Sequence, residues 1–297
     1  MSIRSYPCES LSKVDRHQLI IGSVSPRPIA LVSSIDKNGI SNLAPYSFFT
    51  AISSSPPILV FSVSKPPGPR EQKDTILNLR EVPECVINIV DDKIARQMSL
   101  CSVEFEHGVS EFDKSGLDSV PSKNIKPLRV KSSPVQFECT VRDILVFGNE
   151  PGSSNLVICD VLEIHVNENI MTKEKIRIDS GEINTVGRLG RSDYVKVDLS
   201  NIFTMYQNVK NPIIGFDKLP RHVLQSRLLS ARDLAELASC EKLPGSEEVQ
   251  VFINKNPQYQ KADLPELHKA ALLLIKENKK EEALLCLSIP DLRSGKI

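Results

Sequence analysis

Five hydroxyl side chains stand where apolar runs of the chain end or where a helix is expected to begin. They are Ser33, Ser34, Ser47, Ser62 and Thr75. Hydroxyl and backbone N–H groups in such places can hold a phosphate, and a helix N-terminus adds a favourable dipole. Positive charge stands beside them, because Arg27 opens the first apolar run and Lys73 precedes the expected helix start. A phosphate site built from these residues is our first hypothesis.

Each residue of this set also has a simpler interpretation. Ser and Thr are common in turns and helix caps, and for any single hydroxyl that interpretation is favoured. Asp74 as the N-cap of a short helix, with Lys73 in solvent, is as well supported as a phosphate role. The hypothesis therefore depends on the residues converging in the fold.

The segment Asn42-Leu43-Ala44-Pro45 is a second candidate. Proline cannot donate to a sheet ladder, so a strand that contains Pro45 must bend or expose an edge. Unpaired backbone groups beside the small Ala44 could meet the polar rim of a flat heterocycle. Taken alone, the spacing favours an ordinary edge strand.

The turn Gly187-Arg188-Leu189-Gly190-Arg191, followed by Tyr194, combines glycine with basic residues. It does not match G-x-G-x-x-G, and no strand–turn–helix unit surrounds it, so a Rossmann nucleotide site is not supported. A plain turn is the default interpretation, and a loop that covers a ligand is the alternative.

Several classes of chemistry lack a motif in this chain. Neither H-E-x-x-H nor G-x-S-x-G occurs, so neither a zinc protease nor a classical serine hydrolase is indicated. The seven cysteines are dispersed without C-x-x-C, which favours reduced thiols and no metal site. Cys139 and Cys159 fall inside expected strands, where packing is a better interpretation than nucleophilic chemistry.

Charge and hydropathy exclude two further classes. Lys+Arg and Asp+Glu both number 37, and this balance argues against nucleic-acid binding. No run approaches the apolar length of a membrane span, and the polar N-terminal segment does not resemble a signal peptide. We therefore expect a cytoplasmic protein without a membrane partner.

Most of the chain up to about residue 200 reads as strands. Expected strands cover 27–35, 40–49 (interrupted at Pro45), 58–64, 85–90, 135–146 and 155–166, with short helices over 74–80 and 92–100. Asp36-Lys37-Asn38-Gly39 predicts a hairpin turn, since Asn-Gly tolerates a positive φ.

The character changes after about residue 220. A capped helix is predicted over 230–238, and a strong amphipathic helix over 263–287. We therefore divide the chain into a β-barrel domain, residues 1–205, and a helical C-terminal extension, residues 206–297.

Several motifs in the same order resemble the flavin reductase-like, FMN-binding split β-barrel family. They are Arg27-Pro28-Ile29-Ala30-Leu31-Val32, Asn42-Leu43-Ala44-Pro45-Tyr46-Ser47-Phe48-Phe49, Pro56-Pro57, Lys73-Asp74-Thr75, Glu111-Phe112 with Ser115-Gly116-Leu117, Phe137-Glu138-Cys139, and Arg188-Leu189-Gly190 before Tyr194. The resemblance covers residues 15 to 200 or thereabouts, and the tail lies outside it.

This resemblance implies a mainly β fold, a six-stranded Greek-key split barrel, and a homodimer with FMN near the interface. By the family pattern, Ser33 and Ser34 would lie along the ribityl chain or ring edge. Backbone groups of Asn42, Leu43 and Ala44 would face the pyrimidine side. Four further residues would hold the phosphate, namely Ser47, Ser62, Lys73 and Thr75, while Arg188 and Tyr194 would close the site.

The activity implied is hydride transfer from NADH or NADPH to flavin N5, with FMN as cofactor and FAD as an alternative. The cofactor supplies that chemistry, so the absence of an acid–base motif does not count against it. A non-catalytic electron carrier or flavin-storage module needs the same pocket, and a barrel without flavin that binds a partner through its tail is a third possibility.

Overall fold

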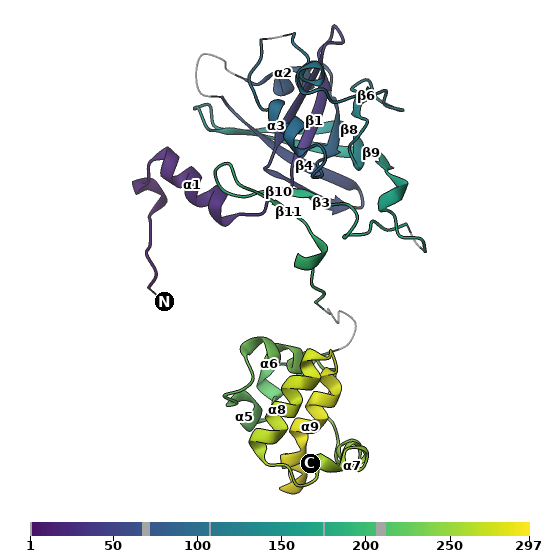
Figure 1. Ribbon diagram of the computed structural model, residues 1–297. Coiled ribbons are helices and arrows are strands. Elements are labelled where there is room, and N and C mark those ends of the chain that lie inside the picture. The colour runs from purple at the N-terminus through teal and green to yellow at the C-terminus, as the bar shows by residue number, and fades with distance from the viewer. Residues whose placement is uncertain (1, 67–71, 107, 175, 206–211) are drawn as a thin grey trace. The chain divides into compact units, whose positions relative to one another are not determined.

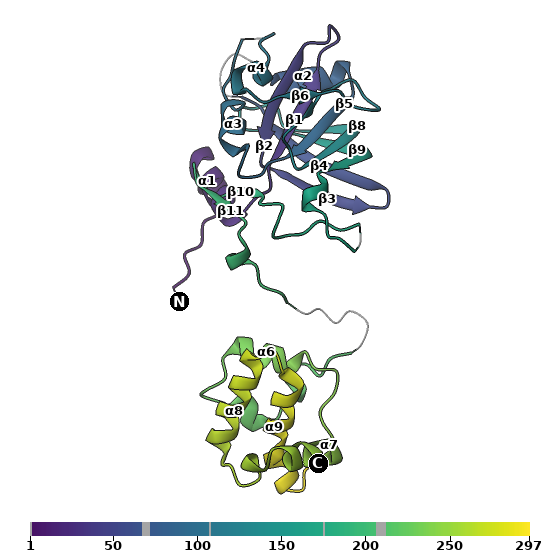
Figure 2. The same ribbon diagram turned by 45° about the vertical axis from the view of Figure 1, so that its right-hand side comes forward.

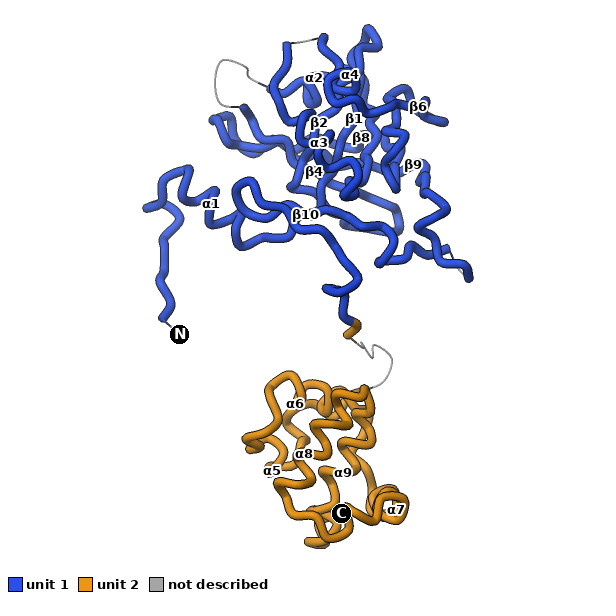
Figure 3. The backbone as a smooth tube through the Cα atoms, in the orientation of Figure 1, with its two compact units in different colours: residues 1–203 blue, residues 204–297 orange. Residues whose placement is uncertain are grey.

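A computed structural model describes residues 2–66, 72–106, 108–174, 176–205 and 212–297 of the chain. Two compact units divide it between residues 203 and 204, where the sequence analysis expected a boundary after residue 205. Figure 3 colours the two units separately, and each is described here by itself.

The first unit is built on one antiparallel sheet of seven strands (Figure 1). Its strands are β1 (Ala30–Ile35), β2 (Ser41–Tyr46), β3 (Phe49–Ser54), β4 (Pro57–Ser64), β5 (Glu84–Ile89), β8 (Val135–Phe147) and β9 (Ser154–Val166). Their order across the sheet is β2-β1-β5-β8-β9-β4-β3. The strands expected over 58–64, 85–90, 135–146 and 155–166 are thereby confirmed within a residue or two.

The two ends of this strand order are joined by only two residues, Ser47 and Phe48. A sheet whose first and last strands follow each other so closely in the chain must roll up. The Ser62 N–H donates to the Phe48 carbonyl over 2.8 Å and fixes the junction against β4. The result is a barrel with a seam between β2 and β3.

The expected count of six strands is wrong for this sheet, which has seven. The segment expected as one strand over 40–49 ends at Tyr46, and a separate strand, β3, begins at Phe49. β3 is short of large apolar residues and mostly exposed, so it gave little hydrophobic signal. It lies at the edge of the sheet and pairs with β4 alone.

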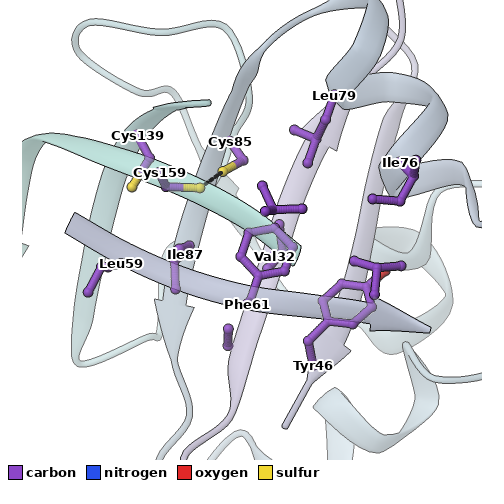
Figure 4. Close-up of a cluster of buried hydrophobic side chains, with 13 residues drawn as sticks. Val32, Tyr46, Leu59, Phe61, Ile76, Leu79, Cys85, Ile87, Cys139 and Cys159 are labelled. Atoms are coloured by element: carbon purple, nitrogen blue, oxygen red, sulfur yellow. Dashed lines mark hydrogen bonds between the residues drawn. The ribbon is translucent and has the colours of Figure 1, made fainter. Parts of the chain in front are cut away.

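The barrel interior is apolar (Figure 4). Phe61 and Val32 meet there, and helix α2 (Asp74–Glu81) contributes Ile76 and Leu79. Asp74 as the N-cap of this helix is wrong: Lys73 occupies the N-cap position, since its carbonyl accepts from Ile76 N over 2.9 Å. Asp74 is the first helical residue, where a carboxylate still favours the helix dipole.

Three cysteines complete this core. Cys85, Cys139 and Cys159 are fully buried, and the Cys85 and Cys159 sulfurs form a thiol hydrogen bond of 3.8 Å (Figure 4). All seven cysteines are free thiols, so the prediction of unpaired cysteines is confirmed. A hydrogen bond with Cys85, and next burial, raise the pKa of Cys159. A hydrogen bond with Cys139, and to a smaller degree burial, raise the pKa of Cys85. These groups pack; they are not poised nucleophiles.

A second apolar layer covers the outer side of β1 and β2. Helices α3 (Ala95–Leu100) and α4 (Glu111–Ser115) lie against β2 (Figure 2). The small hairpin β6 (Ser119–Val120) and β7 (Arg129–Val130) adds to this layer. β1 is therefore buried on both faces, with Val32 inside the barrel and Leu31 under the helices.

Two elements flank one end of the barrel in both ribbon views, helix α1 (Lys13–Ser23) and the ribbon β10 (Val186–Arg188) with β11 (Tyr194–Lys196) (Figures 1 and 2). Arg27 forms a β-bridge with Arg188 just before β1 begins. A Cβ atom at Gly187 would come 2.8 Å from the Pro26 side chain, so glycine permits this close approach.

The second unit is helical. Its helices are α5 (Arg221–Leu224), α6 (Ala231–Ala238), α7 (Ser246–Lys255), α8 (Leu264–Lys276) and α9 (Lys280–Arg293). The capped helix expected over 230–238 is confirmed, with Ser230 and Asp233 in a reciprocal capping box. The single helix expected over 263–287 is wrong, because α8 ends at Lys276 and Asn278 adopts a left-handed φ of 59° that no helix can continue through.

Two absences hold for the described ranges. None of the helices there is long and apolar enough to cross a membrane. No group of three or more His, Cys, Asp or Glu side chains in the described part of the chain is placed to hold a metal ion.

Candidate flavin site

Two clefts open side by side at the seam between β2 and β3, and both are bordered by Pro45, Tyr46 and Lys73. The larger, of about 230 Å³, is called the basic cleft. The smaller, of about 70 Å³, lies toward Asn42 and Glu111 and is called the amide pocket.

The basic cleft brings together residues from five separate parts of the sequence. Those predicted from sequence are Arg27, Ser47, Ser62, Lys73 and Arg188. Other side chains with polar groups in its lining are His17, Tyr46, Ser64 and Arg191. Among the residues that the structure describes, no carboxylate lines this cleft, and its described lining is strongly positive. Such a lining fits an anion.

Arg27 is the buried cation of the cleft, with 5% of its surface exposed. Its guanidinium donates to the carbonyls of Ile21 and Val24 at the end of α1, and to the Leu189 carbonyl over 2.9 Å. Its Nε is buried without a hydrogen-bond partner, and no described carboxylate pairs with it. Burial, and next the nearby charge of Arg188, lower the pKa of Arg27. An anion in the cleft would offset both the cost of burying the Arg27 charge and its repulsion from Arg188.

Arg188 is held in a fixed orientation. Its guanidinium lies 4.9 Å from the Tyr194 ring centre and donates to the Tyr194 hydroxyl over 2.5 Å. It also donates to the Arg191 carbonyl over 2.8 Å. Arg191 itself has a left-handed backbone with φ of 52°, which closes the turn between β10 and β11. Tyr194 thus supports Arg188 from outside the cleft lining and is 38% exposed.

Lys73 belongs to both clefts. Its side chain is about one-third exposed, and its ammonium lies 3.8 Å from Glu104. This distance and exposure make a weak ion pair that an incoming phosphate can outcompete. Lys73 thus combines a charge at the helix N-terminus with access to both clefts.

The wall of the amide pocket is a hydrogen-bonded network around Thr75, which is 1% exposed. Asn42 donates to the Thr75 hydroxyl over 3.0 Å, and the Tyr46 hydroxyl donates to the same oxygen over 2.7 Å. Both lone pairs of that oxygen are then used, which leaves its proton as the group that Thr75 can donate to a ligand. Burial, the largest effect, raises the pKa of Tyr46, which stays a neutral donor.

Glu111 forms the other side of the amide pocket. Its carboxylate accepts from the backbone N–H of Leu43 over 2.8 Å, and it is 7% exposed. Burial raises the pKa of Glu111, and the bond from Leu43 acts against that rise. The N–H of Leu43 is therefore engaged by Glu111.

The remaining predicted residues divide between pocket and interior. Ala44 and Asn42 line the amide pocket, whereas Ser33, Ser34 and Leu43 are fully buried and line neither cleft. The Ser34 hydroxyl accepts from Asn78 and Asn42, over 3.2 and 3.4 Å, while the Ser33 hydroxyl has no hydrogen-bond partner among the described residues. Ser34 thus holds the side chain of Asn42 from the buried side of the pocket wall.

Several residues that line the two clefts were not named as site residues by the sequence analysis. They include His17, Tyr46, Glu111 and Arg191. Tyr46 and Glu111 lay inside quoted motifs, and Arg191 inside the glycine-basic turn, but nothing in their spacing assigned them to a cleft. His17 had no signal, because α1 reaches the site only in the folded chain.

Comparison with known proteins agrees with this geometry. The family model of the flavin reductase like domain matches residues 8–178, more than half of the chain. Among curated relatives, an uncharacterised protein of Aquifex aeolicus is 35% identical, covering 61% of this chain and 89% of its own. YwrF of Bacillus subtilis, also uncharacterised, is 32% identical, and the match covers 65% of this chain and 94% of YwrF.

Solved structures give the same picture. The 2-nitrobenzoate 2-nitroreductase NbaA of Pseudomonas fluorescens is 31% identical with a TM-score of 0.63, over 71% of this chain and all of that one. Component B of nitrilotriacetate monooxygenase from Bacillus cereus is 28% identical with a TM-score of 0.63, and the match covers 70% of this chain and 100% of that one. A Shewanella frigidimarina protein with a split barrel domain shares the fold, at 20% identity and a TM-score of 0.58. The match covers 68% of this chain and 96% of that one.

The rolled sheet with its seam is thus a split barrel, and the residues that line its two clefts lie almost entirely within the matched range. This chain belongs to the flavin reductase-like family.

Proposed function

We propose that this protein binds FMN in the basic cleft and the amide pocket and acts as an NAD(P)H-dependent flavin oxidoreductase. The observation that carries the proposal is the basic cleft, where predicted hydroxyls and cations converge and none of the described lining residues is a carboxylate. When bound, FMN supplies a ring that accepts hydride from a nicotinamide. The protein supplies binding and orientation.

The phosphate end of FMN is assigned to Ser47, Ser62 and Lys73. Hydroxyls and an ammonium at the start of α2 are suitable donors for a phosphate dianion. Thr75 lines the neighbouring amide pocket instead, where its hydroxyl orients Asn42 and Tyr46. Arg27 contributes charge from the interior, since its guanidinium is already held by three carbonyls.

The ring end is assigned to the amide pocket. Asn42, Ala44 and Lys73 line it. Tyr46 and three carboxylates also belong to its wall, namely Asp74, Glu104 and Glu111. At about 70 Å³ this pocket cannot enclose a heterocycle, since closed ligand sites measure roughly 300–1,000 Å³. One face of the ring would therefore stay open, which suits a nicotinamide that stacks on it for a single turnover.

We also propose that a second copy of the chain completes the site. Residues directly opposite on neighbouring strands share a face, so Ser62, Leu156 and Leu145 form a row across the outer side of β4, β9 and β8. Leu145 is 40% exposed, and Phe147 farther along β8 is 60% exposed. This apolar row runs directly into Ser62 of the basic cleft, so a partner seated on it would border the flavin.

The experiment uses the purified full-length chain loaded with FMN. We expect flavin absorption that is lost when NADH or NADPH is added without oxygen, and steady-state nicotinamide oxidation when free FMN is supplied. Tight flavin binding without turnover would contradict the reductase activity and favour a flavin carrier or storage role. A protein that takes up no FMN in a fluorescence titration would overturn the proposal altogether.

A further inference from the structure

The basic cleft carries more positive charge than one phosphate needs. Arg27, Lys73, Arg188 and Arg191 all line it, and none of the three arginines forms an ion pair with a described carboxylate. A phosphate monoester carries about −1.5 to −2 charges at neutral pH. With FMN bound at the Lys73 side, about two positive charges would remain in the cleft.

The surplus charge lies on one wall. Ser47, Ser62 and Lys73 come from the β2–β3 junction, β4 and the start of α2, whereas Arg188 and Arg191 come from the β10–β11 turn. The side chain of Arg191 is exposed and makes no described contact with a carboxylate. The two groups of cations thus belong to different elements, and each can serve a different anion.

The arginine wall is preorganised rather than loose. Arg188 is fixed by the Tyr194 ring, the Tyr194 hydroxyl and the Arg191 carbonyl. Arg27, behind it, is almost fully buried, with one nitrogen left without a partner. Burial, and next the charge of Arg188, lower the pKa of Arg27, so the buried pair of like charges costs free energy that an anion bound in the cleft offsets.

We propose that Arg188 and Arg191 form a second phosphate subsite, which binds a phosphate group of the nicotinamide dinucleotide while FMN occupies the Lys73 side. The inference rests on the proposed function and specifies how the hydride donor is held. Two groups of the dinucleotides have the required chemistry. One is the pyrophosphate, which both NADH and NADPH carry, and the other is the 2′-phosphate, which only NADPH carries. Guanidinium groups bind either one by paired N–H donors.

The test variant is Arg191→Asn, because asparagine is neutral and tolerates the left-handed backbone found at this position. Arg191→Lys keeps the charge, and Arg96→Asn, at an exposed position on α3 outside both clefts, is the matched control. The KM values for NADH and NADPH are measured at saturating FMN, together with the Kd for FMN.

We expect Arg191→Asn to raise a nicotinamide KM about tenfold or more, the effect of losing one charge-assisted contact. The FMN Kd should change far less, Arg191→Lys should recover most of the loss, and Arg96→Asn should match the wild type. Equal rises for NADH and NADPH identify the pyrophosphate, and a rise for NADPH alone identifies the 2′-phosphate. Unchanged KM values for both donors would overturn the second subsite.

A binding measurement separates this inference from the proposed activity. ADP, which carries a pyrophosphate, and 2′,5′-ADP, which carries a 2′-phosphate, are titrated calorimetrically into the FMN-loaded wild type and Arg191→Asn. Binding that is lost in the variant supports the subsite even if neither nicotinamide is oxidised. Absence of binding by both nucleotides to the wild type, in a protein that holds FMN, would refute the subsite and leave FMN binding intact.

Discussion

Thr75 links the two clefts through one hydroxyl group. Its oxygen accepts from Asn42 in the pocket wall and from Tyr46 at the shared border, while its backbone belongs to the first turn of α2 beside Lys73. A single polar atom thus orients both an amide and a phenol that face the proposed ligand. Its role in holding the pocket wall can be tested without any cofactor.

Replacing Thr75 with Val keeps the shape but leaves the buried Asn42 amide and Tyr46 hydroxyl without their acceptor. We expect the free energy of unfolding to fall by about 1–3 kcal/mol, the cost of unsatisfied buried donors. Urea unfolding of the full chain measures it. Thr50→Val, at an exposed position of β3, is the control and should change stability little. Equal stability of Thr75→Val and the wild type would show that the network contributes nothing.

At this scale the sequence predicted that hydroxyls and cations converge, but it did not predict their individual contacts. Hydroxyls and cations near strand ends pointed correctly to a shared cleft, as Ser47, Ser62 and Lys73 show. It could not assign Arg191 or His17, because their place depends on α1 and the β10–β11 turn meeting in space. Ser33 and Ser34 were expected at a ligand, and in this chain they lie fully buried because β1 is covered on both faces.

At the scale of elements, the break between α8 and α9 depends on one backbone conformation. The apolar periodicity continues across the break, so the sequence indicated a single helix, and only the left-handed φ of Asn278 turns the chain. Asparagine is one of the few residues other than glycine that adopt this conformation readily. The periodicity therefore predicted the apolar face of both helices but not their separation.

The conformation of Asn278 makes a directional prediction. Asn278→Val should destabilise the helical unit by about 1–2 kcal/mol, because a β-branched residue is strained in the left-handed region, while Asn278→Gly should be nearly neutral. Urea unfolding followed by circular dichroism at 222 nm compares the two. Equal effects of valine and glycine would contradict a role for the backbone angle.

Ser226, His268 and His222 form a hydrogen-bonded series near α5 and α8, and Asp291 of α9 faces its end. Ser226 accepts from the N–H groups of Leu228 and Leu229, so its hydroxyl proton is directed to His268 Nδ1 over 2.8 Å. His268 Nε2 and His222 Nδ1 lie 3.3 Å apart, and His222 Nε2 faces Asp291 at 3.6 Å. This series requires both imidazoles to be neutral, with their protons on Nε2.

This series predicts a pH dependence of stability. Burial lowers the pKa of both histidines. The charge of His222 lowers the pKa of His268 further. Asp291 raises the pKa of His222 and so acts against its shift, and Lys296 pairs with the Asp291 carboxylate. Folded-state pKa values below the unfolded value mean that the unfolded chain binds more protons. Stability is then fully present above about pH 6.5 and is lost as the pH falls through the folded pKa values.

The measurement is urea unfolding at pH 7.5 and 5.5, followed at 222 nm. The wild type should lose stability at pH 5.5, and His268→Gln should show a smaller loss between the two pH values. His17→Gln, at an exposed position of α1, should behave as the wild type does. A pH dependence that is identical in His268→Gln would refute this assignment.

At the scale of the whole molecule, the rolled sheet explains why the site lies where it does. Ser47 and Phe48 join the two ends of the strand order, so the seam necessarily gathers β2, β4 and the start of α2. The sequence indicated the strands but not β3, whose small and polar residues gave no pattern. Closure of the barrel therefore had to come from the family resemblance and not from the strands themselves.

The proposed second copy is tested at this scale. Leu145→Lys with Phe147→Lys places two charges on the apolar outer row of β8, and we expect a dimeric wild type and a monomeric variant by light scattering after gel filtration. Leu100→Lys, at an exposed position of α3 away from this row, should stay dimeric. A monomeric wild type at micromolar concentration would contradict the proposal.

The central claim is that the basic cleft recognises the phosphate of FMN. FMN and riboflavin, which differ only in that phosphate, are titrated in parallel into the wild type, Lys73→Met and the exposed-site control Lys131→Met. Loss of the Lys73 contact, worth about 1.5–3 kcal/mol, should weaken FMN binding by roughly 10- to 150-fold and leave riboflavin and the control nearly unchanged. Equal losses for FMN and riboflavin in Lys73→Met would contradict the account.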